Sequence, residues 1–309
     1  YSFHEPKMGS PFNIVIYSID SLAANDAALA TFNLVDTLNG IYSDYLETSE
    51  LNRLCETAGK NEWIDVPERL FAILQKAEHA SEISSGSFDV TMGPVVRLWR
   101  KARREKKLPD PDSLKFAKCL VSYKYIELDT LTHKVRLNKA GMRLDLGGIA
   151  KGDAAQRACT RLRELGFPYS LIDAGGDIVV GSTPPQIDGW KIAINLPEKE
   201  ELMSRQLNLQ SKAVATSGDL YQYVELNGKN YSHIINPANG YALTNSRNVT
   251  VIADAGDDAD WLATACSILP IKKALRLIKN NASAEVQITV LKNNKPYFYR
   301  SSGFTSYFK

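Results

Sequence analysis

Residues 144–152, with the sequence LDLGGIAKG, constrain the fold of this chain more than any other stretch. An apolar and charged run precedes them, and a run with alanine and leucine at helical spacing follows. Between the two runs, Gly147 and Gly148 permit a close or left-handed backbone. We therefore predict a strand, a glycine turn and a helix, in that order.

The same turn carries groups that suit an anion. N–H groups at the start of the helix point back toward the turn, and Asp145 and Lys151 add one acid and one base. The spacing matches neither the Walker motif GxxxxGK[ST] nor GxGxxG. Taken alone, the stretch is therefore more simply interpreted as a tight structural turn, with phosphate binding as the alternative.

Strand and helix patterns alternate irregularly along the chain, with many hairpin signals. Residues 11–17 alternate like a strand with one buried face, and Asn227-Gly228 is a typical hairpin turn. Such mixing favours an α+β fold with mixed, largely antiparallel sheets and packed helices over a doubly wound parallel sheet. A length of 309 residues fits one or two domains. We predict a single domain over residues 1–309, with two packed subdomains as the alternative.

Composition excludes several classes of function. A net charge of +2 gives no reason to expect a nucleic-acid partner, and the basic run at residues 101–107 is interpreted as a solvated helix end. The four cysteines form no CxxC pair, which disfavours zinc and redox motifs. No apolar run reaches the ~20 residues of a membrane span. The chain begins at Tyr1 rather than Met, so we expect a removed targeting segment or a trimmed chain.

Three places could carry chemistry. Asp260 and Thr264 are four residues apart and share a helix face, where their oxygens would suit Mg²⁺, although taken alone a helix-start acid and an ordinary buried threonine are the favoured interpretation. His233 lies near a strand edge, and a lone histidine is more often structural. Phe88-Asp89 could hold an aromatic ring system beside a carboxylate, or could be a turn with a buried Phe.

Considered together and in order, these pieces resemble the ApbE family of flavin transferases. The resemblance extends from about residue 8 to residue 269, and so many ordered matches are hard to obtain by chance. The matching pieces are Met8-Gly9-Ser10, Tyr45 with residues 49–54, residues 86–94 with Trp99, residues 145–152, Gly175-Gly176-Asp177, residues 216–219, residues 233–240 and residues 259–265.

The resemblance implies Mg²⁺-dependent transfer of FMN from FAD to a Thr or Ser hydroxyl of an acceptor protein. The product would be a phosphoester, with AMP released. It implies that the Ala150 carbonyl, Asp260 and Thr264 bind Mg²⁺, which makes the opening turn the expected meeting point of metal and FAD. His233 and Asp260 are the expected catalytic residues, and His233 would assist deprotonation of the acceptor hydroxyl. The residues expected at the FAD site are Met8, Tyr45, Ser87, Phe88, Asp89, Asp145, Lys151, His233, Ile234 and Ile235.

Two other activities stay open at this point: an Mg²⁺-dependent FAD pyrophosphatase that yields FMN and AMP, and a non-catalytic FAD-binding protein. The resemblance also implies respiratory or electron-transfer subunits as acceptors. It implies export to the periplasm or the outer face of the bacterial cytoplasmic membrane, with any membrane anchor, such as that of a lipoprotein, on a removed N-terminal segment. Asn236 replaces an Asp usual in the family and Asn239 replaces a Thr, which could reduce turnover if the acid assists catalysis.

Overall fold

The computed structural model describes residues 1–197, 202–218, 223–244, 247–281, 283–293 and 295–308. The chain forms two compact units. Unit 1 comprises residues 1–38, 149–217 and 246–309, and unit 2 comprises residues 39–148 and 218–245. Helices and largely antiparallel strands occur together, so the predicted α+β class is confirmed. The assignment of the whole chain to one domain stays a prediction.

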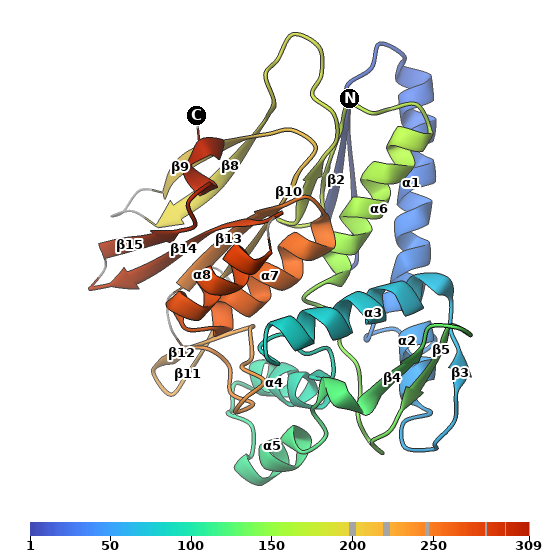
Figure 1. The fold of residues 1–309 in the computed structure, drawn as a ribbon, viewed down its shortest axis with the longest axis vertical. Coiled ribbons are helices and arrows are strands. Elements are labelled where there is room, and N and C mark those ends of the chain that lie inside the picture. The colour runs from blue at the N-terminus through green and yellow to red at the C-terminus, as the bar shows by residue number, and fades with distance from the viewer. Residues whose placement is uncertain (198–201, 219–222, 245–246, 282, 294, 309) are drawn as a thin grey trace. The chain divides into compact units, whose positions relative to one another are not determined.

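Unit 1 is built on an eight-stranded sheet (Figure 1). The pairs of neighbouring strands with a described register are all antiparallel. Strands far apart in the sequence become neighbours, as where β2 pairs with β6. The strand order is β1 (Ser2–Lys7), β2 (Ser10–Ile16), β6 (Ser170–Asp173), β7 (Ile178–Val180), β10 (Ala213–Gly218), β13 (Arg247–Ala253), β14 (Glu285–Lys292) and β15 (Lys295–Arg300).

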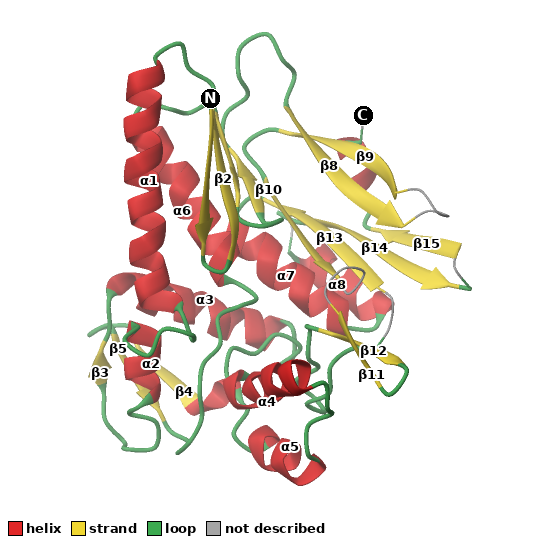
Figure 2. Cartoon of the chain, turned by 180° about the vertical axis from the view of Figure 1, so that it is seen from behind, coloured by secondary structure: helices red, strands yellow, loops and turns green. Residues whose placement is uncertain are grey.

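Helices cover one face of this sheet. They lie in front of the sheet in Figure 1 and behind it in Figure 2, which views the chain from the opposite side. They are α1 (Ser21–Tyr42, whose last residues belong to unit 2), α6 (Ala150–Glu164), α7 (Gly256–Ile268) and α8 (Ile271–Asn280). A hairpin of β8 (Trp190–Pro197) and β9 (Leu202–Leu209), with the short helix η2 (Phe304–Tyr307), shares an apolar cluster with β7, β10 and β13. No described helix is long and apolar enough to span a membrane.

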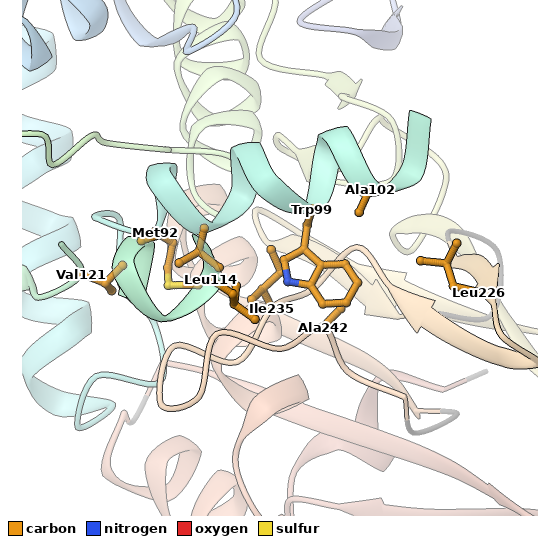
Figure 3. Close-up of a cluster of buried hydrophobic side chains, with 10 residues drawn as sticks. Met92, Trp99, Ala102, Leu114, Val121, Leu226, Ile235 and Ala242 are labelled. Carbon is orange, nitrogen blue, oxygen red and sulfur yellow. The ribbon is translucent and has the colours of Figure 1, made fainter. Parts of the chain in front are cut away.

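Unit 2 combines short helices with two small sheets. Its core surrounds Trp99, which points from its helix toward Ile235 and Ala242 (Figure 3). The helices are α2 (Glu50–Cys55), α3 (Glu68–Ile83), α4 (Gly93–Glu105), α5 (Pro111–Lys118) and the 3-10 helix η1 (Tyr123–Tyr125). The sheets are β3 (Ile64–Asp65), β5 (Lys134–Leu137) and β4 (Ile126–Asp129) in that order, and the hairpin β11 (Tyr223–Leu226) with β12 (Lys229–Ser232).

The predicted strand, turn and helix around residues 144–152 are only partly correct. A strand, β5, ends at Leu137, and the segment from there to α6 is irregular except for a single bridge between Arg143 and Met92. Neither Gly147 nor Gly148 adopts a positive φ. Instead, the N–H of Gly147 donates to Asp145 Oδ1 at 2.8 Å, so a side chain closes this turn. A helix follows the turn, as predicted, and it begins at Ala150.

Candidate functional site

Helices α6 and α7 of unit 1 approach each other closely at two glycines. A Cβ on Gly152 would overlap the carbonyl oxygen of Gly256 and lie 2.8 Å from Cβ of Asp260. The absence of a side chain at residue 152 therefore allows backbone contact between the helices. As a result the N–H of Gly152 donates to Asp260 Oδ2 at 3.2 Å. The glycine that closes the LDLGGIAKG stretch thus places the predicted metal ligand.

Three charged side chains, those of Lys151, Asp177 and Asp260, lie close together at the crossing of α6 and α7. Lys151 Nζ donates to Asp177 Oδ2 at 2.5 Å. Burial and the charge of Asp177 raise the pKa of Asp260 well above its usual value, against the opposing effect of Lys151. Burial likewise raises the pKa of Asp177. Burial alone would lower the pKa of Lys151, but Asp177 and Asp260 reverse this and raise it. Negative charge is therefore in excess in a buried place.

Thr264 and Ala150 complete the predicted metal set within unit 1. Thr264 lies one helical turn after Asp260 on α7, as the spacing predicted. Among the described residues, its hydroxyl has no hydrogen-bond partner, whereas the hydroxyl of Ser267 donates to the Ala263 carbonyl at 2.8 Å. Ala150 is buried in the first turn of α6. Within the described part of the chain, no cluster of three His, Cys, Asp or Glu side chains is arranged to hold a metal.

The Met8 turn lies beside the glycine turn that precedes Asp177. Met8 and Gly9 both have positive φ in the tight connection between β1 and β2. A Cβ on Gly175 would lie 2.7 Å from the Cβ of Ser10, so the two turns touch. Unit 1 therefore brings Met8 and Asp177 toward the same region, although the two are far apart in sequence.

In unit 2, the loop that contains Phe88 and Asp89 is held by its own hydrogen bonds. Phe88 is buried, and its N–H donates to Ser84 Oγ at 3.1 Å. Asp89 Oδ1 accepts from the N–H and the hydroxyl of Thr91, and Oδ2 accepts from the Tyr123 N–H at 3.0 Å. Burial raises the pKa of Asp89 and outweighs these bonds. The loop is thus a turn with a buried Phe, and Ser87 lies half-buried within it.

Asp145 lies next to this loop. Its N–H donates to the Val90 carbonyl at 2.7 Å. Its carboxylate accepts from Arg100 Nη2 at 2.9 Å. Burial and the charge of Asp44 raise the pKa of Asp145, and Arg100 opposes them. Arg100 also donates to Asp44, and its guanidinium lies 4.0 Å from the centroid of the Tyr45 ring. Unit 2 therefore brings together four residues predicted at the FAD site: Tyr45, Phe88, Asp89 and Asp145.

Helix α4 also fixes the segment that contains His233. Arg103 Nη2 donates to the Ser232 carbonyl at 2.8 Å, and Trp99 Nε1 donates to the Gly240 carbonyl at 2.9 Å. His233 is exposed on the bend after β12. Ile234 and Ile235 are buried, and Ile235 packs in the Trp99 core (Figure 3). The side chain of Ile235 is therefore occupied by the core.

The two asparagines that depart from the family pattern close the loop after Ile235. Asn236 Oδ1 accepts from the Ala238 N–H at 2.9 Å. Asn239 Oδ1 accepts from the Tyr241 N–H at 2.9 Å. Both side chains thus stabilise the backbone of this loop.

The structure adds Arg100, Arg103 and Asp44 in unit 2 as site residues that the sequence did not single out. In unit 1 it adds Asp177, which the sequence placed in a matching motif but not at the site, as the partner of Lys151. Arg103 belongs to the basic run at residues 101–107, so that run is not wholly a solvated helix end, although Lys101, Arg104, Lys106 and Lys107 are exposed. Spacing along α4 could have suggested Trp99 and Arg103, since residues four apart share a helix face. Asp219, part of another matching motif, lies outside the described residues.

Comparisons with known proteins agree on one family. The family model described as "ApbE family" matches residues 8–288. The FAD:protein FMN transferase of Treponema pallidum is 32% identical to this chain over 298 residues, covering 90% of this chain and 81% of that protein. The enzyme of that name from Haemophilus influenzae is 31% identical over 255 residues, covering 80% and 74%. The crystal structure of the ApbE protein of Thermotoga maritima superposes with a TM-score of 0.88 at 27% identity, over 100% of this chain and 99% of that one.

Proposed function

Because this chain belongs to the ApbE family, we propose that it is an FAD:protein FMN transferase, an enzyme that transfers FMN from FAD to an acceptor protein. We further propose that the transfer depends on Mg²⁺, that the acceptor group is a Thr or Ser hydroxyl, and that AMP is released. The observation that carries this proposal is the burial of two carboxylates, Asp260 and Asp177, beside the single ammonium group of Lys151 where α6 and α7 meet.

The residues at this crossing fit Mg²⁺. Mg²⁺ prefers oxygen ligands and usually keeps several waters while it binds one or two carboxylates and substrate phosphates. Asp260 supplies a buried carboxylate, Thr264 a hydroxyl without a partner among the described residues, and Ala150 a backbone carbonyl. A divalent cation would also offset the buried charge of Asp260 and Asp177 that Lys151 alone leaves uncompensated. When bound, it would neutralise charge on the phosphates of FAD.

The remaining chemistry falls to side chains and the acceptor. The acceptor hydroxyl oxygen would form a bond to the phosphorus on the FMN side of the pyrophosphate. The bond from that phosphorus to the bridging oxygen would break, and AMP would leave with the bonding electrons. Such transfers depend mostly on positioning and charge stabilisation. Lys151, held by Asp177, would supply positive charge to the phosphates, and exposed His233 would accept the hydroxyl proton.

The flavin itself is assigned to residues of unit 2, and the contact expected from Met8 stays a prediction. Tyr45 offers a largely exposed aromatic ring, whose place is fixed by Arg100. The loop with Ser87, Phe88 and Asp89, together with Asp145 and the segment from His233 to Ile235, supplies the other proposed contacts. This assignment is supported by the proximity of these residues within unit 2 and by the resemblance to the family.

The acceptors proposed are electron-transfer subunits on the outer side of the bacterial cytoplasmic membrane, with the enzyme exported to the same compartment. Only the family resemblance supports this part of the proposal. Cell fractionation followed by detection of this chain and of covalently bound flavin tests it, because both should occur in the periplasmic or membrane fraction. Recovery of both in the cytosol would contradict it.

The transfer is tested by incubating the protein with FAD, Mg²⁺ and an acceptor fragment that carries a flavinylation Thr. A mass increase of one FMN on the acceptor is expected, and it should disappear when EDTA removes the metal. FMN and AMP formed without acceptor modification would instead identify a pyrophosphatase. FAD bound without any product would identify a binding protein, and either result would overturn the proposal.

Asp260→Asn is the matched variant. The amide oxygen can still accept from the Gly152 N–H, so the fold should persist, whereas the charge that would bind Mg²⁺ is lost. We expect FMN transfer to be lost together with the Mg²⁺-induced rise in Tm. Asp254→Asn is the control, because Asp254 is exposed and pairs with Lys212. Transfer and metal stabilisation unchanged in Asp260→Asn would contradict the metal assignment.

A further inference from the structure

Arg100 contacts two separate segments that the proposed function assigns to FAD. Its Nη2 donates to Asp145 Oδ2 at 2.9 Å, and its Nη1 donates to Asp44. Its guanidinium carbon lies 4.0 Å from the centroid of the Tyr45 ring. One side chain on α4 therefore connects the segment that follows α1 with the turn that contains Asp145.

The orientation of the Tyr45 ring depends on this contact more than on burial. Tyr45 is 74% exposed, so little of its side chain packs in the core. Its backbone N–H donates to Ser43 Oγ at 3.2 Å, which fixes the main chain but leaves the ring free to turn. A cation held over the ring face favours one orientation. The guanidinium of Arg100 thus holds an exposed aromatic ring in place.

The carboxylate of Asp145 also depends on Arg100. Asp44 and Asp145 both face this guanidinium, and without it their negative charges would repel each other in a buried place. A guanidinium can donate to two carboxylates through separate N–H groups while its plane stacks on an aromatic ring, whereas a lysine ammonium cannot do all three. The helix that carries Arg100 is itself anchored, because Trp99 and Arg103 donate to the carbonyls of Gly240 and Ser232.

We propose that Arg100 is a positioning residue that sets the affinity for FAD by holding the Tyr45 ring and the Asp145 carboxylate in one arrangement. This inference rests on the proposed function, which assigns Tyr45 and Asp145 to the FAD site. It adds a residue outside that assignment, one that acts on FAD through Tyr45 and Asp145.

The test measures the Kd for FAD by fluorescence titration in the full chain and three variants. Arg100→Gln should weaken binding about tenfold to hundredfold, the scale on which outer-shell partners of ligating groups contribute. Arg100→Lys should fall between this variant and the wild type. Arg104→Gln is the matched control, because Arg104 lies on the same helix with an exposed side chain that pairs with Glu105. It should bind FAD as the wild type does.

A double-mutant cycle distinguishes positioning from a general structural role. In a chain that already carries Tyr45→Leu and Asp145→Asn, adding Arg100→Gln should change the Kd less than about twofold, since its effect passes through those two residues. If the Arg100→Gln effect persists in full in that background, the inference is wrong. Wild-type affinity in Arg100→Gln or in Arg100→Lys also overturns it.

Two further results separate this inference from the proposed function. If the wild-type chain does not bind FAD, the proposed function fails, whatever the variants do. If Arg100→Gln lowers the Tm so far that it cannot be titrated, Asp44→Ala removes the acceptor on one side of Arg100 while leaving Tyr45 and Asp145 intact. Weakened FAD binding in Asp44→Ala supports the inference, and unchanged binding overturns it.

Discussion

The close contact between α6 and α7 makes Gly152→Ala the most informative change in unit 1. The added Cβ would overlap the Gly256 carbonyl oxygen and lie 2.8 Å from Cβ of Asp260. These neighbouring atoms belong to the Gly256 backbone and to the Cβ of buried Asp260, so neither can rotate away. The helices must therefore separate, and the hydrogen bond from the Gly152 N–H to Asp260 should lengthen or break.

The expected magnitude follows from two opposing terms. Overpacking a close contact typically costs about 1–3 kcal/mol, and a clash with backbone belongs at the upper end. Alanine gains at most about 1 kcal/mol over glycine from helix propensity. The free energy of unfolding should thus fall by about 2 kcal/mol. For a chain of this length, such a loss should lower the Tm by about 3 °C.

Thermal unfolding of Gly152→Ala beside Gly40→Ala checks this reasoning. Gly40 is also helical, but it lies on an exposed face of α1, where an added Cβ would have no atom within 4 Å beyond the neighbouring backbone of its own helix. Alanine there should leave the Tm unchanged or raise it slightly. Gly152→Ala should also reduce the Mg²⁺-induced rise in Tm, because Asp260 moves. If both variants unfold at the wild-type temperature, the described approach of α6 and α7 is wrong.

Two further predictions concern the core of unit 2 and the cysteines. Trp99→Phe should lower the free energy of unfolding by about 1–3 kcal/mol in a denaturant titration, because the buried Gly240 carbonyl loses its donor, and wild-type stability would contradict this role. At pH 8, iodoacetamide should modify exposed Cys119 rapidly and the buried thiols Cys55, Cys159 and Cys266 only after unfolding, as peptide mass spectrometry would show. Burial raises the pKa of Cys266 to about 12, so its thiol stays protonated at that pH, and early labelling of Cys266 would refute its burial.

Local elements of the fold could be predicted because their signals are local. The turn at Asn227-Gly228 has positive φ at both residues, as the predicted hairpin turn requires. The strand predicted over residues 11–17 is β2, shifted by one residue. The pairing of β2 with β6 could not be predicted, because it joins strands separated by most of unit 2 in the sequence. The turn at Gly147 was predicted from glycine alone, whereas the Asp145 side chain closes it.

In the candidate site too, local patterns could be predicted from the sequence and contacts between distant residues could not. Helical spacing correctly placed Asp260 and Thr264 on one helix, because i and i+4 residues share a face. The partner of Lys151 is Asp177, which comes from the connection between β6 and β7, and no pattern along the chain joins the two. The role of Arg103 could not be told apart from that of the other basic residues in its run, because its contact with Ser232 depends on how β12 packs against α4.

The departures Asn236 and Asn239 preserve the backbone of the loop between Ile235 and Tyr241. The Asn236 oxygen accepts the Ala238 N–H and so closes the first turn of this loop. An aspartate oxygen would accept the same bond, so Asn and Asp are equivalent for closing the turn. Asn239 likewise uses its oxygen on the Tyr241 N–H, a bond that a threonine hydroxyl could accept. The residues that depart from the family thus keep the loop whose Gly240 carbonyl is bound to Trp99, and with it the position of the segment that contains His233.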